Sequence, residues 1–229
     1  MQKIVVLTGA GISAESGIST FRDADGLWEG HDVMEVATPQ GWHQNQNLVL
    51  DFYNQRRRQL QSVNPNDAHI AIQKLEDKYD VTVITQNVDN LHERAGSTQI
   101  IHLHGELNKV RSTGNPDLVY EWTDDLNQGD LAEDGMQLRP HIVWFGEMVP
   151  MLEPAIDITQ KADIIMIIGT SMQVYPAASL VGFAKLGARI FYIDPKPHVS
   201  TELQRLPQLT IIAEKATIGV VRLVNELLS

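Results

Sequence analysis

The residues best suited to chemistry form a glycine-rich run that follows an apolar segment near the start of the chain. Gly9, Gly11 and Ala14 come directly after residues 4–7 with the spacing G-x-G-x-x-A. In this pattern the first glycine permits a tight turn, the second lets the backbone approach a pyrophosphate, and the small third residue permits close packing. A helix beginning here would also offer free N–H groups to the anion. By itself the motif is a weak indication of nucleotide binding.

Two later segments add polar groups suited to a nucleotide. Residues 164–168 run into Gly169-Thr170-Ser171, whose hydroxyls suit phosphate or ribose, and residues 189–193 end at Asp194, whose carboxylate suits ribose hydroxyls. Open α/β sheets bind ligands at the carboxyl ends of parallel strands, where these groups would meet. The alternative is three tight strand–helix turns without a ligand. An ordinary dehydrogenase is disfavoured, because the glycine-rich run leads into a polar loop rather than a second strand ending in an acid.

The elements that would position these groups alternate along the chain. Short β-branched runs predict buried strands at residues 4–7, 81–84, 164–168, 189–193 and 210–212. Apolar residues at helical spacing predict helices at residues 48–60, 68–78, 177–186 and 217–228. Strands that alternate with helices predict the α/β class, here a Rossmann-like, doubly wound parallel sheet.

Composition and charge exclude several classes of function. The chain has 229 residues with 18 basic and 29 acidic side chains, a net charge of −11, which argues against binding nucleic acid or anionic membranes. It has no cysteine, which excludes disulfides, thiolate catalysis and every cysteine-ligated zinc site. Its apolar runs are too short to cross a membrane. We expect a cytoplasmic protein that works as a monomer.

Several separated motifs, in one order, closely resemble the sirtuin signature. They cover nearly the whole chain and comprise residues 9–13 with 17–18 and 20–22, residues 85–92, 103–105, 144–147, 169–171 and 174–177. The resemblance, closest to class III and the bacterial CobB-type enzymes, implies a Rossmann-like large domain with a small inserted domain. It also implies an NAD-dependent protein-lysine deacylase that acts on acyl-lysine proteins or peptides. NAD is then a co-substrate, and the products are free lysine, nicotinamide and 2′-O-acyl-ADP-ribose.

The resemblance assigns roles to particular residues. The base that takes a proton from a ribose hydroxyl would be His104, because histidine has a suitable pKa for this step. Without the resemblance, His102 would be an equal candidate for the base. Asn87 and Asp89 would hold nicotinamide and its ribose, and Gln86 would contact the ribose. Phe21 and Arg22 would belong to a mobile loop over the cofactor; the alternative is a packed corner with a salt bridge. The remaining NAD contacts would be Gly9, Ala10, Gly11, Ala14, Glu15, Gly169, Thr170, Ser171, Asp194 and Ala216.

The substrate side of the site follows from the same resemblance. Residues 143–147 resemble the strand that pairs with the substrate backbone, which gives affinity with little sequence preference. The carbonyl of Val143 would accept the acyl-lysine Nε–H, while a core strand remains an alternative for Trp144. The expected peptide contacts are Val143, Phe145, Gly146, Glu147, Val174 and Tyr175.

One helical segment bears on the choice of acyl group. Tyr53 and Arg56 stand at i and i+3 and so share a helix face, where a phenol and a guanidinium would suit the distal carboxylate of succinyl- or malonyl-lysine. Arg57, at i+4 from Tyr53, fits equally by spacing, and the resemblance selects Arg56. Ala37 matches the small residue that leaves room for a longer acyl group. A basic helix face turned to solvent is the alternative, and we expect desuccinylation beside deacetylation.

The small domain departs from the family pattern. Sirtuins usually hold structural zinc there with four cysteines, whereas this chain has Ser112 at the first such position and an acidic insert, residues 112–138, in place of the rest. We expect a zinc-free module held by apolar contacts of Leu118, Tyr120, Trp122, Leu126 and Leu131. The expected large domain covers about residues 1–30, 80–105 and 140–229, and the small domain about residues 31–79 and 106–139.

Two other functions fit an NAD site. One is mono-ADP-ribosyl transfer, which would use the same activated ribose without acyl-lysine, and the other is a non-catalytic module that senses NAD. Replacing His104 would separate a binder from an enzyme, because only the enzyme would lose its function.

Overall fold

A six-stranded parallel sheet forms the centre of the larger part of the molecule. The computed structural model describes residues 1–19, 27–206 and 208–229. The strand order is β11-β10-β9-β1-β4-β5. The bounds are β1 (Lys3–Thr8), β4 (Asp80–Thr85), β5 (Ile100–His102), β9 (Ile164–Ile168), β10 (Arg189–Ile193) and β11 (Leu209–Ile212). The α/β class and the five predicted strands are confirmed.

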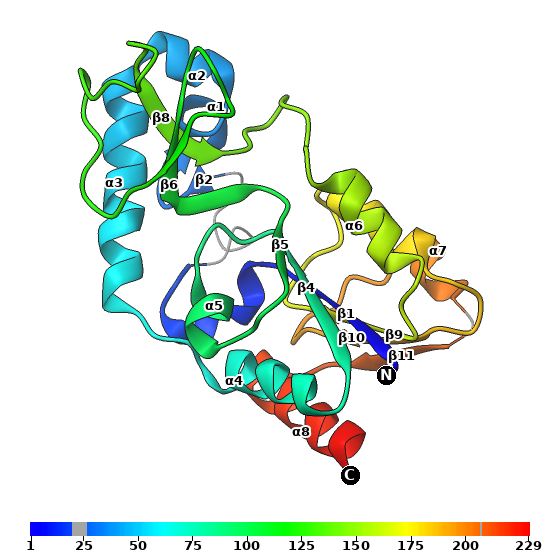
Figure 1. Cartoon of the computed structure of the whole chain (residues 1–229). Helices are drawn as coiled ribbons and strands as arrows, with labels where there is room; N and C mark the ends of the chain where they lie inside the picture. Colours follow the sequence, from blue (N-terminus) through cyan, green and yellow to red (C-terminus); the bar gives the residue numbers. More distant parts are fainter. Residues whose placement is uncertain (20–26, 207) are drawn as a thin grey trace.

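Helical segments cover both faces of this sheet because the strand residues are apolar on both sides. Ile4 and Val6 of β1 pack toward α4 (Asp67–Lys74) and α8 (Ala216–Leu228), which lie side by side beneath the sheet in Figure 1. Val5 and Leu7 pack on the opposite face, toward α6 (Leu152–Thr159) and the 3-10 segment η5 (Ala177–Phe183). Shorter elements on this part are η4 (Leu75–Asp77), α5 (Leu91–Ala95) and α7 (Thr201–Gln204).

Two predicted helices differ in kind. The segment at 177–186 is the 3-10 helix η5, and the glycine-rich run enters two short 3-10 turns, η1 (Ala10–Ile12) and η2 (Ala14–Ser16), instead of an α-helix. The second turn ends at Gly17, whose φ is 98°. The expected α-helix N-terminus facing an anion is therefore absent from this described segment.

A smaller part stands beside the sheet, at the upper left of Figure 1. Its antiparallel sheet has the order β7-β6-β8, from β6 (Gly105–Ser112), β7 (Val119–Glu121) and β8 (Leu138–Ile142). Helix α3 (Gln46–Ser62) packs on it, with α1 (Val33–Val36), α2 (Pro39–Gln44), β2 (Leu27–Trp28) and β3 (His31–Asp32) nearby. Helix α4, which falls within the expected small-domain range 31–79, packs against the core of the large sheet.

Buried polar side chains hold the acidic insert to α3. Arg57, which is fully buried, donates from Nε to the carbonyl of Leu107 at 3.0 Å and from Nη1 to the carbonyl of Asp124 at 3.1 Å and to Asn54 Oδ1 at 2.7 Å. Asn54 in turn bonds both backbone groups of Leu126, at 3.0 and 2.9 Å. The insert is therefore held by buried polar bonds in addition to apolar contacts, and the sequence did not predict the polar bonds.

The predicted apolar contacts of the insert are only partly present. Leu126 is fully buried, and Tyr120 and Trp122 pack against the core of the smaller part. Leu131, in contrast, is 57% exposed, because its neighbourhood is a turn bridged to Gln137 at the edge of the molecule.

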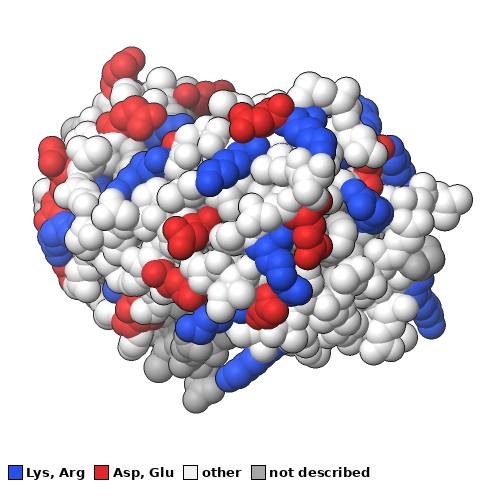
Figure 2. Space-filling view, turned by 90° about the horizontal axis from the view of Figure 1, so that it is seen from below, with Lys and Arg blue, Asp and Glu red and all other residues white. Residues whose placement is uncertain are grey.

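Charged side chains are spread over the face of the molecule drawn in Figure 2. On the face in Figure 2, basic and acidic side chains of the described residues are interspersed rather than gathered by sign. Within the described residues, no helix has the length and apolar character needed to cross a membrane.

Candidate active site

A cavity of about 600 Å³ lies where the carboxyl ends of the central strands face the smaller part. It gathers nearly every site residue predicted from the sequence. Phe21 and Arg22 lie outside the described residues, and Arg56 does not line the cavity. The predicted residues that do line it are Gly9, Ala10, Gly11, Ala14, Glu15, Ala37, Tyr53, Gln86, Asn87, Asp89, His104, Val143, Phe145, Gly146, Glu147, Gly169, Thr170, Ser171, Val174, Tyr175, Asp194 and Ala216.

The glycine-rich run is bound tightly to the loop after β9. Gly9 N donates to the carbonyl of Ile168 at 3.0 Å, and Gly11 N donates to that of Gly169 at 2.8 Å. A Cβ on Gly11 would lie 2.6 Å from Gly169 Cα, closer than atoms can approach. The two loops therefore need glycine for their own contact, in addition to any approach by a ligand.

At the far end of the cavity, two acidic side chains are tied to nearby backbone. Asp194, which is buried, accepts a bond from Lys196 N at 2.8 Å. Glu15 accepts from the Thr217 hydroxyl at 2.8 Å and from Thr217 N at 3.2 Å, at the start of α8. These bonds shape the pocket wall beside Ala216.

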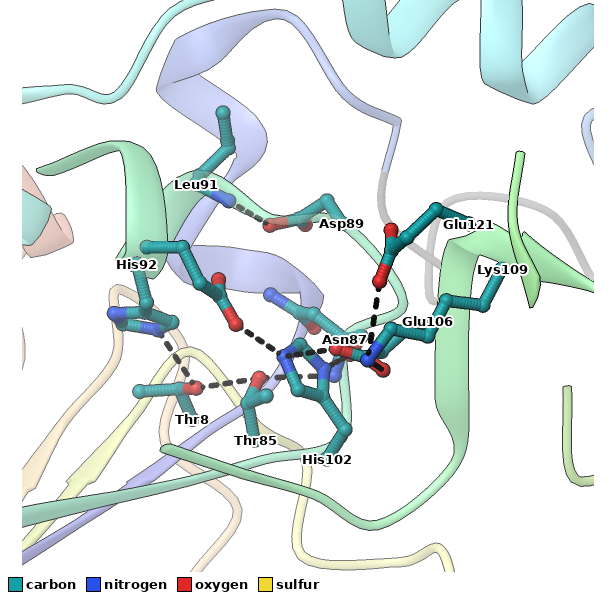
Figure 3. A network of polar contacts seen from close by, with 11 residues as sticks. Thr8, Thr85, Asn87, Asp89, Leu91, His92, His102, Glu106, Lys109 and Glu121 are labelled. Atoms are coloured by element: carbon teal, nitrogen blue, oxygen red, sulfur yellow. Dashed lines mark hydrogen bonds and ion pairs between the residues drawn. The ribbon is translucent and has the colours of Figure 1, made fainter. Parts of the chain in front are cut away.

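Ser13 links the two side chains predicted to bind nicotinamide. Its hydroxyl donates to Asp89 Oδ2 at 3.0 Å and accepts from Asn87 Nδ2 at 3.2 Å. Leu91 N donates to the other oxygen of Asp89 at 3.1 Å, as Figure 3 shows. Burial raises the pKa of Asp89, although both donors oppose the rise. Ser13 is not among the site residues predicted from the sequence, although its place inside the glycine-rich run was an available signal.

The two candidate histidines have different surroundings. His104 lines the cavity, and its Nδ1 donates to the carbonyl of Gln86 at 3.1 Å. Burial lowers the pKa of His104, which favours the neutral ring with a lone pair on Nε2. His102 lies behind this wall, with its Nε2 2.6 Å from Glu93 Oε1. Burial alone would lower the pKa of His102, but the bond to Glu93 and its charge raise it overall.

Residues 143–147 leave the sheet instead of forming the expected strand. Strand β8 ends at Ile142, and Gly146 has φ 89° in the turn that follows. Two backbone bonds fix this turn: Val143 N donates to the carbonyl of His104, and Phe145 N to that of Ala37, both at 2.9 Å.

The side chain of Glu147 is used within the protein. It accepts from Arg139 Nη1 at 2.7 Å and from Trp144 N at 2.8 Å, and Arg111 Nη2 lies 3.4 Å away. The guanidinium of Arg139 also stacks over the Trp144 ring, 3.3 Å from its centroid. Glu147 thus braces the wall of the cavity.

Tyr53 lines the cavity, as do Ala37 and Trp144. Its hydroxyl accepts from Trp144 Nε1 at 3.0 Å, and burial raises its pKa. Arg56 points elsewhere: its Nη1 donates to the carbonyl of Phe52 at 2.7 Å, and its guanidinium lies 4.1 Å from the Phe52 ring centroid. The structure therefore does not bring the Tyr53 and Arg56 side chains together in the pocket. Arg57, equal to Arg56 by spacing, is committed to the acidic insert.

Comparison with known proteins gives a consistent result. The model of the Sir2 family matches residues 9–176. The chain is 66% identical over 196 residues, 86% of each chain, to an NAD-dependent protein deacylase of Helicobacter pylori. It is 54% identical over 226 residues to one of Bacteroides thetaiotaomicron, covering 96% of this chain and 95% of that one.

Solved structures extend the likeness to the fold. A Sir2 homologue in complex with ADP-ribose has a TM-score of 0.86 and 39% identity, with 99% of this chain and 93% of that chain covered. A complex of Sir2 with a p53 peptide and NAD has a TM-score of 0.79 and 28% identity, covering 97% and 92%.

Proposed function

The chain belongs to the Sir2 family and is an NAD-dependent protein deacylase, and we propose that His104 is the base at the junction of an NAD site and an acyl-lysine site. The observation that carries this proposal is the cavity itself. His104, the residues predicted for NAD and those predicted for the peptide all line it, which supports a shared site.

NAD supplies a ribose whose C1′ becomes electrophilic as nicotinamide leaves, so the protein needs no nucleophile of its own. His104 would accept a proton from a ribose hydroxyl through Nε2, because its Nδ1–H is engaged by Gln86. The lowered pKa of His104 supports this role, since a base must begin unprotonated. Closing the cavity over the reacting sugar would keep water from competing.

Asn87 and Asp89 would bind the nicotinamide end. An amide and a carboxylate suit a carboxamide and its ribose. The Ser13 hydroxyl bonds the side chains of both Asn87 and Asp89 and so fixes their relative positions. The remaining strand-end loops, with Glu15, Asp194 and Ala216, would hold the adenosine end. The Sir2 homologue solved with ADP-ribose supports a nucleotide in this region.

The peptide would lie between the turn at residues 143–147 and Val174-Tyr175. Phe145 and Tyr175 line the cavity and are 46% and 65% exposed, so a bound peptide could reach both side chains. Recognition through the peptide backbone would allow many substrate sequences. The solved Sir2 complex with a p53 peptide supports a protein substrate.

The acyl pocket would accept acetyl and, after Arg56 turns inward, succinyl or malonyl. An anionic acyl end could draw the guanidinium away from the Phe52 carbonyl, because a charged pair is stronger than a bond to a neutral carbonyl. Tyr53 accepts from Trp144, so its own O–H can donate to a carboxylate.

Arg56→Met tests the acyl pocket. We expect kcat/KM for a succinyl-lysine peptide to fall roughly 10–100-fold, as for a lost charge-assisted bond, with deacetylation within about twofold. Arg58→Met, an exposed arginine on the same helix, is the matched control and should change neither rate. Equal loss of both activities in Arg56→Met would remove Arg56 from the pocket.

We also propose that the smaller part, elements β2–α3 with β6–β8, needs no zinc. Ser112 stands where the resemblance places a metal ligand, yet its hydroxyl donates to Asp134 at 2.6 Å and accepts from Gly114 N at 2.9 Å. A hydroxyl used in this way does not suit zinc. Stoichiometric zinc in the purified protein, found by elemental analysis, would contradict this.

The cellular setting follows as a further proposal. A net charge of −11, with charges of both signs interspersed on the face in Figure 2, suits a cytoplasmic monomer that binds neither nucleic acid nor membranes. Light scattering on the purified protein would test the monomer directly.

A further inference from the structure

The loop that carries Asn87 is held by hydrogen bonds to four successive backbone carbonyls. Backbone amides donate to the first and the last of these carbonyls: Leu103 N donates to the carbonyl of Thr85 at 2.9 Å, and Leu107 N donates to that of Val88 at 2.8 Å. Histidine rings donate to the two carbonyls between them: His104 Nδ1 donates to the carbonyl of Gln86 at 3.1 Å, and His102 Nδ1 donates to that of Asn87 at 3.2 Å. Four successive carbonyls, residues 85–88, thus accept bonds from residues 102–107.

His102 differs from His104 in its second nitrogen. Its Nδ1 faces the carbonyl of Asn87, and its Nε2 faces the carboxylate of Glu93 at 2.6 Å. Both partners are acceptors, so both nitrogens must carry a proton for the two bonds to form together. The geometry therefore requires a doubly protonated, cationic ring, whereas His104 needs a proton on one nitrogen only.

The charges around His102 come from three elements (Figure 3). Glu93 lies on α5, and Glu106 Oε1 on β6 is 3.7 Å from His102 Nε2. Lys109, also on β6, pairs with Glu106 and lies 3.7 Å from Glu121 on β7. The cations His102 and Lys109 thus alternate with the three carboxylates.

Two further ionisable groups face this network. The charge of His102 acts to lower the pKa of both Asp89 and His92. Of these two residues, Asp89 lies in the candidate nicotinamide site. A metal ion could use the cluster of Glu93, His102 and Glu106, but its carboxylates already have cationic partners.

We propose that His102 is a positioning residue, which as a cation fixes the peptide after Asn87 and so aims the Asn87 and Asp89 side chains at nicotinamide. It also links this loop to the small sheet through Glu106 and Lys109. The inference rests on the proposed roles of Asn87 and Asp89. His102 does not line the cavity, so it acts through the loop and not on the substrate.

The test is steady-state kinetics on His102→Gln, with His43→Gln, an exposed histidine on α2, as the matched control. The inference predicts a KM for NAD about tenfold higher, from one lost charge-assisted bond, with the peptide KM within about twofold. An unchanged KM for NAD, even with lower kcat or melting temperature, would show a merely structural role and overturn the inference.

A second variant keeps the experiment decisive if His102→Gln fails to fold. Glu93→Gln retains an acceptor but removes the charge that helps to raise the pKa of His102. Because the Glu93 charge helps to keep the His102 ring protonated, the KM for NAD should begin to rise at a lower pH in Glu93→Gln than in the wild type. A pH profile that matches the wild type would contradict the inference.

A failure of the role proposed for His102 can be distinguished from a failure of the proposed nicotinamide contacts. Wild-type protein that shows NAD-dependent deacylation, with both variants normal, would overturn only the role of His102. Wild-type protein in which Asn87→Ala leaves the KM for NAD unchanged would overturn the proposed nicotinamide contacts, and with them this inference.

Discussion

The cavity lies between two regions that are built in different ways. On the large sheet, the wall is made by backbone bonds at strand ends, where Gly11 and Gly169 approach too closely for any side chain. On the smaller part, the wall is held by hydrogen bonds of polar side chains. Arg57 and Asn54 bond the acidic insert, and Glu147 bonds Arg139 beside the pocket. The difference separates a site whose shape depends on backbone geometry from one that depends on individual side chains.

If the smaller part binds no zinc, as proposed above, its buried polar bonds can take the structural role of a metal. A metal site would tie separate loops at one point, and here Arg57 ties α3, β6 and the acidic insert at one point through three acceptors. Buried groups of this kind are costly to disrupt because each lost donor leaves an acceptor without water.

On the large-sheet side, we expect that a substitution can remove the chemistry without disturbing the folded NAD site. His104→Ala should lower kcat roughly 10²–10⁴-fold, the usual contribution of a general base, while NAD binding measured by calorimetry persists. His43→Ala serves as the control. Full turnover in His104→Ala would mean that another group removes the proton.

On the smaller part, the comparison predicts that one side chain carries much of the stability. Arg57→Met should lower the free energy of unfolding by about 2–4 kcal/mol in urea titration, because three buried acceptors lose their donor. Arg58→Met, whose partner Asp125 is exposed, should cost less than about 1 kcal/mol. Equal effects of the two variants would erase the distinction drawn between the regions.

A methyl group tests the backbone contact of the glycine-rich run. Gly11→Ala should cost about 1–3 kcal/mol of stability, since its Cβ would meet Gly169 at 2.6 Å. The control is Gly182→Ala, where a Cβ meets nothing within 4 Å and no loss is expected. A stable Gly11→Ala protein with weak NAD binding would instead assign this glycine to the ligand alone.

The sequence predicts the large-sheet side well because the signal is local. Apolar β-branched runs locate the strands, and the parallel arrangement then brings Gly9, Gly169 and Asp194 to one edge. The two 3-10 turns after Gly9 were missed, since the bond from Gly11 N to Gly169 that holds them comes from a distant segment.

Prediction is weaker on the smaller part because its contacts are long-range and polar. Arg56 and Arg57 are equivalent by spacing, and only the path of residues 107–126 makes Arg57 the buried one. The orientation of Arg56 toward Phe52 likewise depends on a side-chain conformation that no sequence pattern specifies. The turn at 143–147 follows from bonds to Ala37 and His104, far away in the chain.

The most direct test is to incubate the protein with matched acetyl-lysine and succinyl-lysine peptides, with and without NAD, and to identify all products by mass spectrometry. We expect loss of both acyl groups only when NAD is present, with nicotinamide and the corresponding 2′-O-acyl-ADP-ribose formed in equal amounts. NAD consumed without loss of either acyl group, or ADP-ribose attached to an acceptor, would contradict this expectation.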